Sequence, residues 1–250
     1  YTSDGTLIRN FSSSNQITIT STHNVTKSVK VRAKDNAGND SGFSNTLSFT
    51  PDTVGPPTPT ISGPSGTITS LSATYTASSA GAVYYQFQDD DAEVIQDWST
   101  SNKITLTSTH GVNKRVKARA KDAVGNRSTN FSNYGSFTPD VVGPGAVTIN
   151  TPASPSNDTT PSWTWNNVES GATYRVRLSS NNGSSYGSYS GWAYTGRTYT
   201  PTLSSNGSYK IQVQSRDSLG NEGAVATSGT YTLDTVAPST PTFSAQPPAT

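Results

Sequence analysis

Apolar and polar residues alternate over short stretches of this chain, and clusters of Gly, Asn, Asp and Ser separate the stretches. The clearest stretch is Val29–Lys34, where small apolar residues alternate with Lys or Arg, and Val116–Lys121 and Tyr209–Gln214 repeat its pattern. A period of two residues places the apolar side chains on one face of a strand and the polar ones on the other. The pattern predicts half-buried antiparallel strands at these three places.

No segment shows an apolar period of 3.6 residues, so we expect essentially no helix. Hydrophobic residues make up 30% of the chain, which is low for a globular protein, while charged residues make up only 13%. A β-sandwich reconciles these values, because its thin core needs few apolar residues and Ser and Thr can cover its outer faces. The predicted fold class is therefore all-β, built from antiparallel β-sandwich domains.

The sequence repeats itself. Residues Ser14–Asn39 reappear 87 residues later as Ser101–Asn126, with 18 of 26 positions identical, and Asn206–Asn221 is a more divergent third copy. Self-similarity at such a spacing indicates a tandem array of domains. An array is more often a spacer or a binding surface than one catalytic body.

A short pattern, Asp-x-Val-x-Pro, follows each copy and is called the joint below. The three joints are Asp52–Pro56, Asp140–Pro144 and Asp234–Pro238. Because each Pro fixes φ and restricts the residue before it, we expect the joints to be semi-rigid. They divide the chain into a partial first repeat (1–53), a second repeat (54–141), a third repeat (142–235), and a linker with the first strand of a following repeat (236–250).

The first repeat has no counterpart of Pro57–Tyr84, a segment long enough for about three strands. We therefore expect that it does not close a core alone, since its strands would lack partners. The missing strands would come from a further part of the protein, or from a neighbouring molecule in an assembly.

The turn Ala-Lys-Asp-x-x-Gly-Asn, followed by a strand and the joint, resembles the bacterial immunoglobulin-like repeats of large secreted adhesins and surface proteins. The third repeat also resembles a fibronectin type III domain. Trp163 and Trp165 stand where that family places an early core Trp, and Leu203 and Tyr209 match its Leu–Tyr corner. The first two repeats depart from this pattern, with Lys at the Tyr position. The resemblance implies tandem sandwiches in an extended array, a secreted or cell-surface location, and a role in adhesion, spacing or matrix assembly.

Composition narrows the classes of function. The chain has no Cys, a net charge of +1 and no apolar stretch long enough to span a membrane, so neither nucleic acid nor a membrane is an expected partner. His23 and His110, the only two histidines, occupy the same repeat position, and the third repeat has none. No Ser/His/Asp triad or zinc site follows from such a pattern. We expect no catalytic residues and no enzyme activity in this chain.

Calcium at the domain joints is the cofactor that the sequence allows. Carboxylate and backbone carbonyl oxygens suit Ca²⁺, and Asp recurs at the joints and in the turns. The candidate ligands are Asp52, Asp140 and Asp234 in the joints and Asp35, Asp122 and Asp217 in the turns. Asp is also an ordinary turn and capping residue, so a purely structural role is the alternative.

Two sets of side chains are candidate binding surfaces. The third repeat carries regularly spaced aromatic residues in a Gly/Ser-rich segment, and they could stack on a ligand: Tyr186, Tyr189, Trp192 and Tyr194. Trp98 follows an alternating strand and is expected in the core. The Lys and Arg residues that alternate along Val29–Lys34 and Val116–Lys121 could bind anionic polysaccharide, or could simply be the wet face of a strand.

The sequence thus predicts a structural repeat module of a bacterial extracellular protein, acting as a spacer and load-bearing rod in a stalk, fibre or filament. Its partners would be neighbouring repeats, other copies in a fibre, or a polysaccharide. One alternative is a carbohydrate- or host-binding module that uses the aromatic segment of the third repeat. The other is an accessory region of a secreted polysaccharide-active enzyme.

Overall fold

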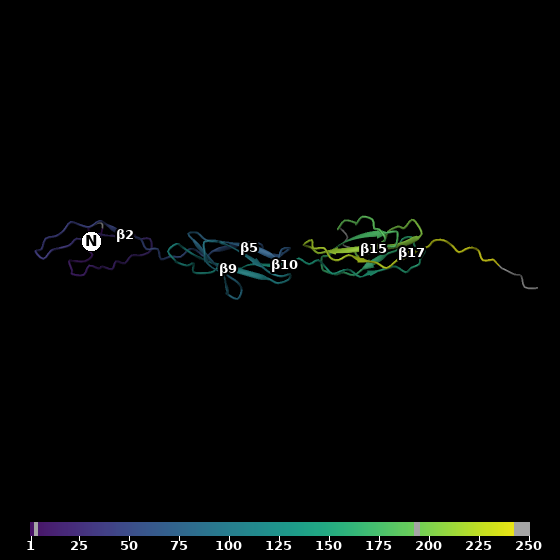
Figure 1. Cartoon of the computed structure of the whole chain (residues 1–250), viewed down its shortest axis with the longest axis horizontal. Coiled ribbons are helices and arrows are strands. Elements are labelled where there is room, and N and C mark those ends of the chain that lie inside the picture. The colour runs from purple at the N-terminus through teal and green to yellow at the C-terminus, as the bar shows by residue number, and fades with distance from the viewer. Residues whose placement is uncertain (3–4, 193–195, 243–250) are drawn as a thin grey trace, which may run out of the picture. The chain divides into compact units, whose positions relative to one another are not determined.

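The chain is all-β in the computed structural model, which describes residues 1–2, 5–192 and 196–242 (Figure 1). The prediction of antiparallel sheets and essentially no helix is confirmed. No helix that could cross a membrane occurs among the described residues. Strands of the first repeat are β1 (Lys27–Val29) and β2 (Leu47–Phe49). Those of the second are β3 (Thr60–Ser62), β4 (Gly66–Ile68), β5 (Ser72–Ser78), β6 (Tyr84–Gln88), β7 (Val94–Ser99), β8 (Lys103–Thr107), β9 (Lys114–Lys121) and β10 (Gly135–Pro139).

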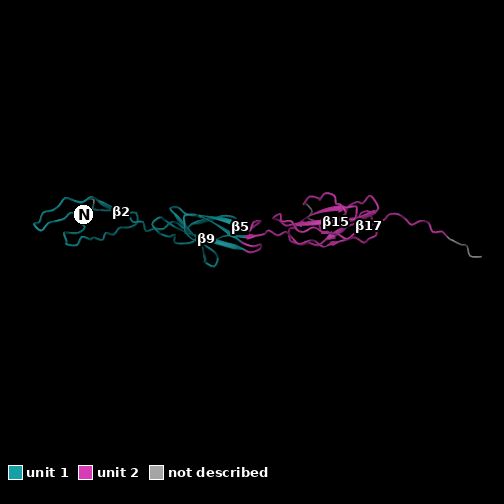
Figure 2. Cartoon of the chain, in the orientation of Figure 1, with its two compact units in different colours: residues 1–66, 72–107, 113–137 teal, residues 67–71, 108–112, 138–250 magenta. Residues whose placement is uncertain are grey.

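The third repeat contains seven of the strands. They are β11 (Ile149–Asn150), β12 (Trp163–Trp165), β13 (Thr173–Ser179), β14 (Thr198–Tyr199), β15 (Gly207–Arg216), β16 (Ala226–Thr227) and β17 (Tyr231–Leu233). The whole chain divides into two compact units, which Figure 2 colours teal and magenta. Unit 1 holds residues 1–66, 72–107 and 113–137, and unit 2 holds residues 67–71, 108–112 and 138–250. The repeat boundaries at 53, 141 and 235 are a finer division and stay a prediction.

The second repeat places two sheets around one core. Its strand orders are β4-β10-β9-β6-β7 and β3-β5-β8. The alternation predicted for Val116–Lys121 is confirmed, because Val116, Ala118 and Ala120 of β9 are fully buried while the residues between them face outward. Tyr75 from the other sheet lies 6.4 Å from Phe137, ring centroid to centroid, so the two sheets meet through aromatic side chains.

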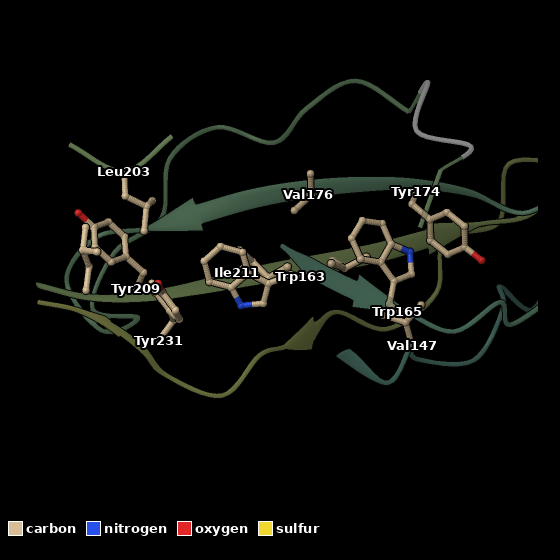
Figure 3. Close-up of a cluster of buried hydrophobic side chains, with 11 residues drawn as sticks. Val147, Trp163, Trp165, Tyr174, Val176, Leu203, Tyr209, Ile211 and Tyr231 are labelled. Carbon is tan, nitrogen blue, oxygen red and sulfur yellow. The ribbon is translucent and has the colours of Figure 1, made fainter. Parts of the chain in front are cut away.

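The third repeat has sheets β11-β12-β14 and β13-β15-β16, and β17 pairs with β15 (Figure 1). Its core is aromatic (Figure 3). Trp163 packs edge-on against Tyr231 at 5.6 Å, and Trp165 packs in the same way against Tyr174 at 5.8 Å. Tyr209 donates a 2.6 Å hydrogen bond to the backbone carbonyl of Ser205, which is the local bond expected of a Leu–Tyr corner.

The first repeat lacks a closed core. The strand predicted over Val29–Lys34 is wrong beyond Val29, where β1 ends. Val31 is 67% exposed, whereas its counterpart Ala118 is fully buried. Phe49 is 41% exposed, whereas its counterpart Phe137 is fully buried. Alternation alone does not hold a strand when no second sheet covers its apolar face.

Candidate functional site

The Asp-x-x-Gly-Asn turn is a self-contained hydrogen-bonded unit. In the second repeat, Oδ1 of Asp122 accepts backbone N–H bonds from Val124, Gly125 and Asn126 at 2.8–3.0 Å. The side-chain amide of Asn126 donates to Oδ2 of Asp122 at 2.9 Å. Gly125 has a φ of 105°, a conformation that favours Gly, so the pattern specifies this turn residue by residue.

The third repeat builds the same turn around Asp217. Burial raises the pKa of this carboxyl, but hydrogen bonds from the side chain and backbone of Asn221 and from the backbone of Leu219 and Gly220 outweigh burial and hold the pKa below its ordinary value. The same balance lowers the pKa of Asp122. In the first repeat, the hydrogen bond from the Asn39 side chain is the main cause of the lowered pKa of Asp35.

The first joint is fastened to the turn of the second repeat. The side-chain amide of Asn126 donates one hydrogen bond to Asp122 and a second, at 3.1 Å, to the backbone carbonyl of Asp52. Gly55 lies so close to the backbone of Arg127 that a Cβ at this position would overlap the Arg127 carbonyl group. The joint therefore needs Gly at this position in order to lie against the turn.

The second joint repeats this contact. Asn221 donates one amide hydrogen to Asp217 and the other to the backbone carbonyl of Asp140, the second at 3.1 Å. A Cβ at Gly143 would overlap the carbonyl group of Glu222. Two joints in one chain thus use the same three elements, namely an Asn amide, an Asp carbonyl and a Gly in close backbone contact.

The first two joints are also held from their other side by a loop that carries a histidine. Thr53 N–H donates to Nδ1 of His23 at 3.2 Å, and Val141 N–H donates to Nδ1 of His110 at 3.3 Å. The same two nitrogens lie 3.5 Å from Oδ1 of Asp52 and Asp140 respectively. The histidines therefore anchor the start of these two joints, a structural role that sequence position alone did not specify.

The third joint differs at the critical position. It carries Ala237 where the first two have Gly55 and Gly143. Asp234 caps its own segment, accepting a 2.9 Å hydrogen bond from Val236 N–H, and Val236 is 72% exposed. A joint with Ala cannot approach a turn of this kind as closely as a joint with Gly.

The candidate calcium ligands lie partly together. Asp52 and Asp122 both contact Asn126, and Asp140 and Asp217 both contact Asn221. The oxygens involved already accept hydrogen bonds from N–H groups. Within the described ranges, no group of three or more His, Cys, Asp or Glu side chains could hold a metal ion. Calcium binding by any of the six candidate Asp residues stays a prediction.

The outward residues of β9 form a second recurring feature, the cationic face. Its cations are Arg115, Lys117, Arg119 and Lys121 on β9, with Arg127 after it; its rings are Tyr84, Trp98, Phe131 and Tyr134. The cations lie 4.3–5.5 Å from the ring centroids. The expectation that Trp98 is a core residue is wrong, since it is half-buried under Lys121 and Arg127. Aromatic side chains here support cations on the outer face.

The aromatic segment of the third repeat follows the same plan. Tyr189 is flanked by the guanidinium groups of Arg175 and Arg177 at 4.5 and 4.3 Å. Trp192 is flanked by Arg175 and Arg216 at 4.3 and 4.6 Å. Tyr186 lies 5.1 Å from Arg177. Tyr194 falls outside the described residues.

The guanidinium groups on these rings weaken the case for a sugar-stacking site in this segment. A sugar ring stacks on an aromatic face that is open, and the described rings of this segment are half-buried and carry guanidinium groups. Arg175 is itself tied to Gln214 at 2.6 Å and to Glu222 at 3.0 Å. The segment is thus a cation–aromatic stack that stabilises the outer face of β13 and β15, and its use as a ligand platform stays a prediction.

The joints and the turns are both evident in the sequence, but the contact between them is not. Asn126 and Asp52 are 74 residues apart, and Asn221 and Asp140 are 81 apart. One signal was present in the sequence: the Gly of Val-Gly-Pro is shared by the first two joints. Likewise, Phe131 and Tyr134 gave no alternating pattern that would assign them to the cationic face.

No protein-family model matches the chain, and no curated protein matches it. Solved structures similar to it include fibronectin type III domains. They include the FN1–FN3 domains of chicken CNTN1 (16% identity, covering 83% of this chain and 77% of that one, TM-score 0.34). The fibronectin(III)-like modules of Clostridium thermocellum CbhA match at 16% identity over 70% of this chain and 93% of theirs, TM-score 0.34. A segment of two fibronectin type III domains from chicken tenascin matches at 13% identity, covering 71% of this chain and 99% of that one, with a TM-score of 0.32.

Proposed function

We propose that this chain is a structural repeat module of a bacterial extracellular surface protein, serving as a spacer and load-bearing segment of a stalk or fibre. The observation that carries the proposal is the docked joint, which occurs twice with the same contacts. A spacer must limit bending between its domains. A joint held by an Asn amide on one side and a His ring on the other has fewer accessible conformations than a free linker of the same length.

Hydrogen bonding between the first and last segments of the third repeat supports the load-bearing part of the proposal. Ser156 N–H donates to the carbonyl of Thr232 at 3.0 Å, and Asp234 N–H donates to the carbonyl of Ser156 at 2.9 Å. The bridge between Ser156 and Leu233 is parallel. A pull on the two ends of this repeat would load these bonds together in shear, rather than open them one after another.

Side chains reinforce the same patch and allow a test. Tyr231 donates a 2.6 Å hydrogen bond to the carbonyl of Asp158, and Thr232 N–H donates to Oγ of Ser154 at 2.7 Å. The variant Ser154→Ala/Tyr231→Phe removes both bonds and keeps the buried ring. We expect a lower unfolding force for the third repeat in single-molecule pulling, with about 1–3 kcal/mol lost in equilibrium stability.

The control is Tyr174→Phe, which removes a 2.8 Å bond from a buried Tyr to Asn167 at a site away from the patch. It should lower equilibrium stability by about 0.5–1.5 kcal/mol and leave the unfolding force nearly unchanged. A load-bearing role for the patch would be contradicted if the two variants lose the same unfolding force for each kcal/mol of unfolding free energy lost. Wild-type repeats that unfold at forces too low to detect would contradict the proposed function itself.

A further inference from the structure

Neighbouring carboxylates balance only part of the charge on the cationic face of the second repeat. In the described part of the chain, the ion pairs within 4.0 Å include one member of the face, Arg115, whose Nε lies 3.7 Å from Asp90. Asp97 is the other nearby acid. Hydrogen bonds from the Trp98 backbone and the Gln86 side chain lower its pKa, and the nearby charges of Lys121 and Arg127 lower it further. Lys117, Arg119, Lys121 and Arg127 therefore have no carboxylate in direct contact. The five cations of the face outnumber these two acids, so the face carries an excess of positive charge although the net charge of the whole chain is only +1.

The rings hold these cations in place. Lys117 lies 4.9 Å from the centroid of Phe131, and Arg115 lies 4.3 Å from that of Tyr134. A cation resting on a ring keeps its N–H groups available to an anion, and it loses less side-chain freedom on binding than an unrestrained Lys or Arg. Arg119 donates a 2.9 Å hydrogen bond from Nε to the backbone carbonyl of Ser128. The face is thus a pre-ordered row of hydrogen-bond donors.

The spacing of the row suits a polymer. Alternate residues of a strand lie about 7 Å apart, so the four cations of β9 extend along roughly 20 Å. A single small anion would contact one or two of them, whereas a chain that carries repeated anionic groups can contact all of them. No ring of this face is bare, because each described ring carries a cation. Bases of single-stranded nucleic acid need open rings for stacking, and this argues against nucleic acid.

We propose that the cationic face of the second repeat binds an acidic polysaccharide, carboxylated or sulfated, through charge and hydrogen bonding rather than through ring stacking. The third repeat contributes less, since Arg175 is paired with Glu222 and Arg177 donates to Gln212. This proposal does not depend on the load-bearing role. If either proposal is contradicted by experiment, the other is unaffected.

The test uses the whole chain and dextran sulfate as the probe, with neutral dextran of the same length as the control. We expect binding at low salt that weakens steeply as salt rises, and no binding of neutral dextran. Lys117→Gln/Arg119→Gln should weaken binding of dextran sulfate about tenfold. Lys103→Gln/Lys114→Gln removes the same charge from positions off the face and should weaken it less than about twofold.

Thermal melts of both double variants verify that the fold is kept. If Lys117→Gln/Arg119→Gln fails to fold, Arg127→Gln replaces it, because this exposed side chain contacts only Trp98 in the face. Three results would overturn the proposal: no binding of dextran sulfate at low salt, equal weakening by both double variants, or tighter binding of duplex DNA than of dextran sulfate at equal charge.

Discussion

At the scale of single residues, Asn126 and Asn221 connect two parts of the chain that a reader of the sequence would treat separately. Each uses both amide hydrogens, one on its own turn and one on the joint before it. Asp122 and Asp217 are buried under this contact, at 8% and 4% exposure. Asp35, whose turn has no docked joint in this chain, is exposed. In the two repeats where a joint is docked on the turn, the turn Asp is buried.

The carboxylate of Asp217 gives a prediction about pH. Its pKa is lowered in the folded state, so it stabilises the fold above the ordinary Asp pKa of about 3.9, and this stabilisation is lost as the pH falls through the lower folded value. Asp217→Asn should cost about 1 kcal/mol of unfolding free energy at pH 6 and much less at pH 3. Urea unfolding of both proteins at the two pH values measures this, with Glu169→Gln as a matched loss of charge in an exposed turn. A cost that stays the same at pH 3 would contradict the role of the ionised carboxylate.

At the scale of elements, the sequence was a good guide where a second sheet covers the strand. The alternation of Val116–Lys121 and Tyr209–Gln214 lies within β9 and β15, and their apolar residues are buried. Val29–Lys34 has the same alternation, yet its strand ends at Val29. The periodicity of a segment indicates which face a strand would bury. Whether the strand forms depends on packing of that face against a second sheet. The joint–turn contact was beyond prediction for the related reason that it joins residues more than seventy positions apart.

Hydrogen exchange tests this account of the first repeat. Lys27–Val29 of β1 and the matching Lys114–Val116 of β9 have closely similar sequences, but Val29 lies in an open half-sandwich and Val116 in a closed core. We expect amide protection in β1 to be lower by a factor on the order of a hundred or more. Equal protection in the two strands would mean that the first repeat is closed in solution by contacts of its own.

At the scale of the whole molecule, the chain combines two features that recur from repeat to repeat: a docked joint and a cation–aromatic outer face. The cores are thin, and Ser and Thr occupy many outward positions of the strands, as on β5, which accounts for the low hydrophobic content of 30%. The first two joints have Gly at the point of closest approach and the third has Ala237. We expect the first two to be stiff couplings of a spacer and the third to be a more pliant one.

The most direct measurement of this claim is a distance distribution across the second joint, within unit 2, by pulsed electron paramagnetic resonance. The chain has no Cys, so spin labels can be placed at Thr109→Cys, in the loop that holds this joint, and at Ser180→Cys, both exposed positions of unit 2. A docked second joint predicts one narrow distribution, which Gly143→Ala broadens, because the added Cβ displaces the joint from Glu222. Asn221→Ala should broaden it as well. A wild-type distribution as broad as that of a variant with a Gly-Ser linker at 140–144 would contradict the account.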